Sequence, residues 1–363
     1  MEIAYWKGRT VNTETVVVHG KRIAWIDCVK FSGILFVVMN HAELNIPVIS
    51  RFGSLFYVPV FFVLAGFTYH HKEEPFTLFV KRKAKRLLVP YFGYNIFLYL
   101  FFLCKDYIIP GKLTWHALIP LLGIAYSRNS LYPIDSANNT FFLTILNSPT
   151  WFLTALFLSF VLFEFCVRFS KNNYLIFWMM QALFLAVGIF LNDRIPILLP
   201  WSMENVFIFV VFIASGLALQ KELVNIKRKE SIITLVIFFI GIYFLAIFNG
   251  SMNISVSEFG NFMLIGIILS IGGSFWIIAT CYVLRNHIPK GVTLIGEHSM
   301  NIMCLHMFIF MFIKTAYNLW YPGLLEGETG ITILAKSFMV TTSMAILTIC
   351  DMVWNLRRRK LHG

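Results

Sequence analysis

Three ionisable residues lie inside the first membrane-length apolar segment of the chain, residues 23–42. In a helix, Lys30 and His41 share one face, because their spacing advances about 20° beyond whole turns. They are roughly 16 Å apart along the axis, and Asp27 precedes Lys30 by one turn. Ionisable groups in lipid are costly, so these three side chains are expected to face a polar cavity and to form a functional site.

Histidine is the member of this set that suits proton transfer. An imidazole with an unperturbed pKa of about 6.5 accepts a proton at neutral pH, so His41 is a candidate general base. Two structural alternatives stay open. In the first, His41 is a hydrogen-bonded residue at a helix end. In the second, Asp27 and Lys30 form an i,i+3 ion pair that eases insertion into the membrane.

A cationic cluster at residues 81–86 contains Arg82, Lys83 and Arg86. Its cations are suited to binding the phosphates of a nucleotide cofactor. The alternative is a cytoplasmic anchor that interacts with anionic lipids.

A further pair of polar residues lies late in the chain. His306 follows Ser299 by seven residues, on about the same helical face, in the middle of another apolar segment. A histidine in mid-span usually faces the protein interior, so His306 is predicted to line the reaction cavity.

Composition fixes the class of protein. Hydrophobic residues make up 58% of the 363 residues, charged residues 13%, and phenylalanine occurs 38 times. A soluble domain would expose much of this apolar surface, so the sequence predicts an all-α, polytopic integral membrane protein. We expect ten spans, with a tail at 1–20, a membrane domain at 21–354 and a basic tail at 355–363. The expected spans are 23–42, 53–70, 88–104, 151–169, 174–191, 205–219, 232–248, 260–284, 294–313 and 331–354.

The net charge of +12 indicates membrane topology and no nucleic-acid partner. With the N-terminus inside, 22 lysines and arginines fall in cytoplasmic segments and 6 in outer segments. This asymmetry predicts that both termini are cytoplasmic and that the His41 end of the first span is outside. The long outer segment 105–150 contains residues 115–126, too short to span, which are expected to form an interfacial helix or a connector. The six cysteines lack metal-ligand spacing and are expected to pack as apolar residues, with no metal bound.

Several motifs resemble the membrane-bound acyltransferase-3 family, more narrowly its fucose 4-O-acetylase-like branch. The resemblance covers about residues 21–354. Lys30 and His41 match the basic residue, ten others and histidine of that family's first helix. The stretches 58–67 and 79–91 match its second block, although Ala65 stands where the family usually has serine. Trp151-Phe152-Leu153 at the start of the fourth span and the stretch 295–306 match later blocks.

The resemblance implies that an acyl group, expected to be acetyl, is transferred from cytoplasmic acyl-CoA to a hydroxyl of an extracytoplasmic or lipid-linked sugar. In this scheme Arg82, Lys83 and Arg86 bind the CoA phosphates. Asp27 and Lys30 line the path of the cofactor arm, and His41 activates the acceptor. Trp151, Ser299 and His306 are expected to bind substrate, although an aromatic anchor at the interface is the simpler account of Trp151. The expected location is the bacterial cytoplasmic membrane, with membrane lipids around the spans.

Two other functions fit parts of the pattern. A flippase or exporter of lipid-linked glycans would share the many spans, the buried charges and the basic inner loops. It would move a substrate without an acyl donor, and it would not require His41. A scaffold subunit is disfavoured by the number of charges within the spans.

Overall fold

The computed structural model describes residues 22–129, 147–224 and 228–362, and all of its regular elements there are helices. The predicted tail 1–20 and residues 130–146 of the predicted outer segment 105–150 lie outside these residues. Eight helices are long and apolar enough to cross a membrane, and the bent pair α2 (Pro47–Phe56) and α3 (Pro59–Phe67) makes a ninth. The one remaining predicted span, residues 23–42, corresponds to α1 (Ala24–His41). This helix has 18 residues but is more polar than the other spans, because it carries Asp27, Lys30, Asn40 and His41. The predicted all-α polytopic fold is confirmed.

Two compact units make up the described chain, and α3 and α10 (Met263–Val283) begin in one unit and end in the other. Of the described residues, unit 1 contains 62–129, 147–224 and 249–271, and unit 2 contains 22–61, 228–248 and 272–362.

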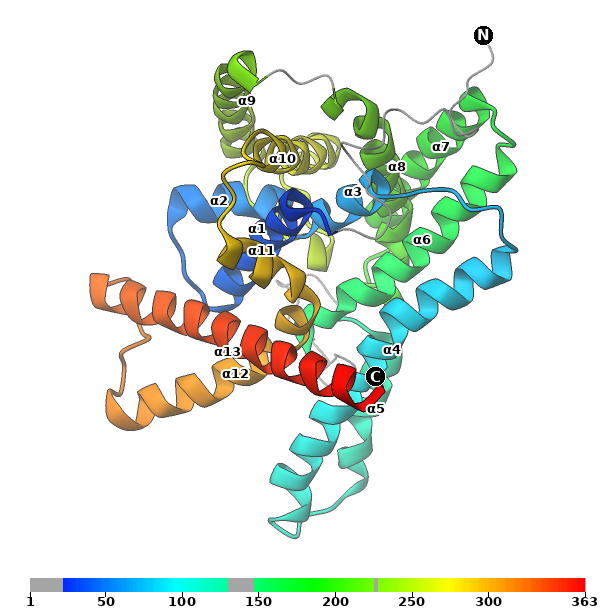
Figure 1. Ribbon diagram of the computed structural model, residues 1–363. Coiled ribbons are helices and arrows are strands. Elements are labelled where there is room, and N and C mark those ends of the chain that lie inside the picture. Colours follow the sequence, from blue (N-terminus) through cyan, green and yellow to red (C-terminus); the bar gives the residue numbers. More distant parts are fainter. Residues whose placement is uncertain (1–21, 130–146, 225–227, 363) are drawn as a thin grey trace. The chain divides into compact units, whose positions relative to one another are not determined.

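Unit 1 is built on α6 (Trp151–Phe169), which packs against α4 (Phe76–Leu103) and α8 (Met203–Val224), with α7 (Tyr174–Arg194) beside α8 (Figure 1). In the α6 span 78% of residues are buried, against 17% in α7. Helix α6 is therefore the core of the unit, and α7 presents most of its apolar side chains outward, as a lipid-facing helix does. The ring of Phe62 stacks on Phe209 at 4.3 Å and meets Phe152 edge-on at 5.4 Å.

The cationic cluster lies on α4, which begins at Phe76 and not near residue 88 as predicted. Lysine and arginine are good helix formers, so nothing in residues 76–87 ends the helix. Residues 115–126 are helical, as a 3₁₀ turn, Trp115–Leu118, followed by α5 (Ile119–Tyr126), and their position at the membrane interface stays a prediction.

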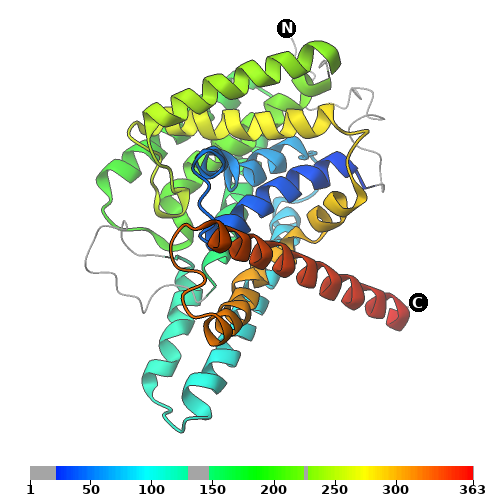
Figure 2. The same cartoon turned by 90° about the vertical axis from the view of Figure 1, so that its left-hand side faces the viewer.

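Unit 2 surrounds α1 with α2, α11 (Lys290–Glu297), α12 (Ser299–Trp320) and α13 (Gly330–His362). Helices α12 and α13 lie side by side as a hairpin (Figure 1), and α13 continues through the predicted basic tail. Helix α9 (Arg228–Asn249) runs beside residues 272–283 of α10 (Figure 2), where the Trp276 indole N–H donates to the Leu235 carbonyl at 2.8 Å. The ring of Phe52 on α2 packs on Trp276 at 5.0 Å, which joins α2 to this pair.

Candidate active site

A network of ion pairs occupies the first turns of α1. The Lys30 ammonium donates to Asp27 Oδ1 at 2.9 Å, and the Arg22 guanidinium donates to Asp27 Oδ2 at 3.1 Å. Arg22 also pairs with Glu297. Asp27 is 3% exposed, so its carboxylate is held by two cations in place of water. The predicted i,i+3 pair is confirmed, and it belongs to a larger network.

Helix α11 lies directly against α1 at this network, and a glycine allows the approach. A Cβ atom at Gly296 would lie 1.8 Å from the carbonyl oxygen of Asp27. Only a residue without a side chain lets the two backbones meet at this distance. The close approach places Glu297 within reach of Arg22, so the late sequence block 295–299 completes the charge network of the first helix.

His41 and His306 lie next to each other at the other end of α1. Their ring centroids are 5.1 Å apart, with the ring planes inclined at 49°. His306 is fully buried, and the ring of Phe310 covers it from one turn further along α12 at 5.6 Å. Two residues that were predicted separately therefore form one site within unit 2.

Backbone hydrogen bonds set the tautomer of His306. Its Nδ1 lies 2.9 Å from the Ile302 carbonyl and 3.1 Å from the Met303 carbonyl. A carbonyl only accepts, so Nδ1 must carry the hydrogen, and in the neutral ring Nε2 then carries a lone pair. Among the described residues Nε2 is buried without a hydrogen-bond partner. His306 is thus arranged to accept a hydrogen bond through Nε2, and its predicted place in the reaction cavity remains a prediction.

Ser299 is the first residue of α12, seven residues before His306 and half-buried. Its neighbour His298 contacts the Asp351 carboxylate through Nδ1. This pair joins the start of α12 to α13 and gives Asp351, a charge within a predicted span, a partner. Helical geometry places Ser299 about 10 Å along the axis from His306, so it does not contact the histidine pair.

Two lysines fix the turn that follows α1. The Lys336 ammonium donates to the Glu43 carbonyl oxygen at 3.0 Å, and the Lys314 ammonium lies 3.5 Å from the Glu43 carboxylate. Glu43 has a φ of 55°, a left-handed conformation that costs energy for a non-glycine residue. These contacts from α12 and α13 hold the turn beside His41.

The predicted phosphate-binding residues differ in how far their cationic groups are exposed and free to bind a phosphate. Lys83 faces α6, with its ammonium 3.2 Å from the centroid of the Phe160 ring and 5.4 Å from that of Phe79. Arg82 pairs with the Glu74 carboxylate at 2.5 Å, and Arg86 is exposed. Arg82 and Arg86 share a helical face, and Lys83 is covered by aromatic rings. These residues lie in unit 1, so the predicted path from them to α1 remains a prediction.

Trp151 begins α6, as predicted, but it is 4% exposed and packs within unit 1. Its burial does not fit the alternative of an aromatic anchor at the membrane interface. The Arg128 guanidinium lies 6.0 Å from its ring, and Phe209 lies 6.3 Å from it. The structure does not bring Trp151 together with Ser299 and His306 in one unit.

Arg128 is a fully buried cation, although its position in the sequence predicts only one of the six basic residues of the outer segments. It contacts the Ser202 hydroxyl and lies 3.1 Å from the Glu204 carboxylate. Glu204 also accepts hydrogen bonds from the Ser257 hydroxyl at 3.0 Å and the Leu199 amide at 3.1 Å. A lone arginine in a polar loop has no periodic pattern, so nothing in the sequence could have indicated this burial.

Glu164, another charge within a span, is held by residues of unit 1. It accepts from the Tyr69 hydroxyl at 2.6 Å and from the Arg168 Nε–H at 2.8 Å. Burial raises the pKa of the Tyr69 phenol, so the phenol keeps its proton and remains a donor. These contacts are enough to account for Glu164 as a structural residue.

Comparison with known proteins identifies the class. The acyltransferase-3 family model, described as an acyltransferase domain, matches residues 23–350. The chain belongs to this family and is a membrane acyltransferase, which favours acyl transfer over transport of lipid-linked glycans. No curated protein and no solved structure was found to match it.

Proposed function

We propose that this protein transfers an acetyl group from cytoplasmic acetyl-CoA to a hydroxyl of an extracytoplasmic or lipid-linked sugar. The contact between His41 and His306 carries the proposal, because it brings two imidazole rings together in a family that performs acyl transfer. The motifs of the first two sequence blocks support the fucose 4-O-acetylase-like branch. The proposed location is the bacterial cytoplasmic membrane.

In the proposed reaction His41 takes the proton of the acceptor hydroxyl. The hydroxyl oxygen attacks the thioester carbonyl, the carbon–sulfur bond breaks, and CoA leaves as a thiolate that recovers the proton. The products are the sugar ester and free CoA. His306, with its Nε2 lone pair beside His41, orients the acceptor or the His41 ring. A covalent acyl-histidine is the competing route, in which the imidazole itself attacks the thioester.

Donor binding is assigned to the cationic cluster. Arg86 is exposed and is the principal candidate for the CoA phosphates, with Arg82 on the same face. A phosphate at Lys83 would have to replace its contact with the Phe160 ring, so Lys83 is the weakest of the three. Lys30 is too far along α1 to exchange a proton with His41, so we assign it and Asp27 to the electrostatics of the cofactor path.

The experiment that tests the proposal compares surface glycans from cells with and without the gene for this protein. Loss of an O-acetyl ester, detected by mass spectrometry before and after mild alkaline hydrolysis, is the expected result. Purified protein in proteoliposomes should release CoA in proportion to ester formed. Unchanged glycan esters together with no acetyl-CoA-dependent product would overturn the proposal.

A further inference from the structure

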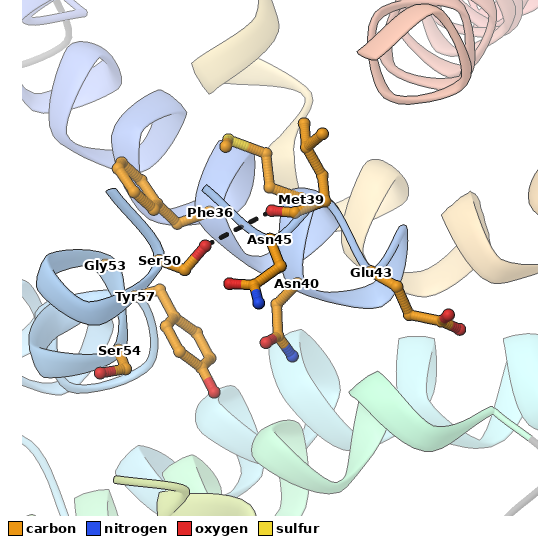
Figure 3. A pocket seen from close by; sticks show the side chains of 10 residues that line it. Phe36, Met39, Asn40, Glu43, Asn45, Ser50, Gly53, Ser54 and Tyr57 are labelled. Carbon is orange, nitrogen blue, oxygen red and sulfur yellow. Dashed lines mark hydrogen bonds between the residues drawn. The ribbon is translucent and has the colours of Figure 1, made fainter. Parts of the chain in front are cut away.

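A small pocket of mixed polar and apolar lining lies at the end of α1 that carries His41 (Figure 3). It has a volume of about 250 Å³ and lies entirely within unit 2. Asn40 immediately precedes His41 in the last turn of α1, so the pocket begins within one helical turn of the predicted base. The basic asymmetry of the chain places this end of α1 outside the membrane.

Three side chains in the pocket that are able to form hydrogen bonds form none with other described residues. Asn40, Asn45 and Tyr57 gather around the same space (Figure 3), and within the described chain their side chains have no hydrogen-bond partner. By contrast, Ser50 accepts from the Ile46 amide at 3.0 Å and Ser54 donates to the Arg51 carbonyl at 2.8 Å. The pocket therefore has a structural rim and a set of available polar groups.

The chemistry of these groups selects a ligand class. Two carboxamides and a phenol each donate and accept, and all three are neutral. Neutral groups of this kind match a polyhydroxyl ligand better than a phosphate, which would call for cations. The carboxylate of Glu43 at the rim faces Lys314, so it adds little net charge. Phe36 and Tyr57 provide aromatic surfaces for the apolar face of a sugar ring.

We infer that this pocket binds the acceptor sugar, with Asn40, Asn45 and Tyr57 as the groups that hold its hydroxyls at the end of α1 that carries His41. The inference rests on the proposed function and deepens it by naming where the acceptor binds. The alternative occupant is the acyl-pantetheine arm of the donor, which also carries hydrogen-bonding amides. The two occupants differ in which substrate responds when the pocket is altered.

Steady-state kinetics in proteoliposomes distinguish the acceptor sugar from the acyl-pantetheine arm as the occupant of the pocket. The acceptors are methyl α-L-fucoside and the delipidated surface glycan of the source cells. Each of Asn40→Ala, Asn45→Ala and Tyr57→Phe should raise the acceptor KM by about 5- to 10-fold, since one net hydrogen bond is lost. The KM for acetyl-CoA should stay unchanged. Tyr243→Phe, which removes a phenol hydroxyl from α9 in the same unit, is the matched control and should change neither constant.

Labelling supplies a readout that does not depend on turnover. In a background without Cys104 and Cys350, the exposed native cysteines, Ser54→Cys should react with an impermeant maleimide added from outside, and the acceptor glycan should slow this reaction. Val48→Cys, outside the pocket on the same helix, should react equally with and without glycan. Protection by acetyl-CoA in place of glycan, or a raised donor KM, would overturn the inference. Wild-type protein that forms no ester would instead refute the proposed function.

Discussion

The imidazole rings of His41 and His306 lie 5.1 Å apart, although one ends α1 and the other lies in α12, near the far end of the sequence. The contact places a predicted base beside a buried residue whose tautomer the backbone determines. A single histidine on a helix end has an ordinary structural explanation. Two histidines in contact, one with a buried Nε2 that has no hydrogen-bond partner among the described residues, lack that explanation and support the proposed proton transfer.

His41→Gln should remove activity and leave the fold intact. Glutamine has a similar volume and forms hydrogen bonds, but it does not take up a proton at neutral pH. Ester formation should fall by about 10²- to 10⁴-fold, the range for loss of a general base. Turnover with acetyl-CoA, together with thermal unfolding in detergent, checks this. His116→Gln, on the exposed 3₁₀ turn in unit 1, is the control and should behave as wild type. A well-folded, nearly fully active His41→Gln protein would refute the mechanism.

Two substitutions at His306 separate its two nitrogens. In His306→Asn the amide N–H replaces Nδ1 as donor to the Ile302 carbonyl, but no acceptor remains at the position of Nε2. His306→Leu loses both. His306→Asn should be the more stable of the two variants, because it keeps the hydrogen bond to the Ile302 carbonyl. If His306 positions the acceptor, both variants should lose acetyl transfer to the sugar more than acetyl transfer to water. Measurement of sugar ester and free acetate from the same reaction decides this. Equal loss of both products would assign His306 to the chemical step itself.

Arg86→Gln should weaken donor binding more than Lys83→Gln does. Arg86 is exposed, whereas the Lys83 ammonium is already covered by the Phe160 ring. We expect the KM for acetyl-CoA to rise about 5- to 10-fold for Arg86→Gln, because a charge-assisted hydrogen bond contributes roughly 1.5 kcal/mol or more. Lys81→Gln removes the same charge from the cluster and controls for effects on insertion. A donor KM that is unchanged in correctly inserted Arg86→Gln protein would favour the membrane-anchor alternative.

Arg128→Gln should destabilise the protein by about 3–5 kcal/mol, because it leaves the buried Glu204 carboxylate without its cation. Thermal unfolding in detergent measures the loss. The double variant Arg128→Gln/Glu204→Gln should recover part of it, since no buried charge is then left unpaired. Arg194→Gln breaks the exposed pair with Asp193 and should cost less than about 1 kcal/mol. An Arg128→Gln protein as stable as Arg194→Gln would mean that the Arg128–Glu204 pair is not buried in the membrane-embedded protein.

The predicted topology is tested by cysteine labelling in a background without native cysteines. A cysteine introduced at Lys81 should react only after the membrane is permeabilised, whereas one at Asn45 should react from outside. The expectation follows from the excess of basic residues on the cytoplasmic side. Labelling of the Lys81 position in intact cells would reverse the orientation, and with it the outer placement of the pocket at the end of α1.

The amino-acid sequence by itself determined the features that depend on neighbouring residues. Apolar length predicted the membrane helices, and the start of α6 at Trp151 and the Asp27–Lys30 pair follow from local spacing. These features need only the geometry of one helix. The bounds of α4 were missed because strong helix formers continue a helix beyond the apolar region that signals a span.

The tertiary structure alone decided what each polar side chain meets. The contact of His41 with His306, the aromatic cover on Lys83 and the burial of Arg128 all join residues far apart in the chain. The same holds for Gly296, whose missing side chain lets α11 meet the backbone of α1 at Asp27. Helical periodicity tells which face a residue occupies, but the partner on that face depends on how the helices pack. The spacing of Lys30 and His41 therefore indicated a site, and the packing of α1 against α11 and α12 supplied the remaining groups.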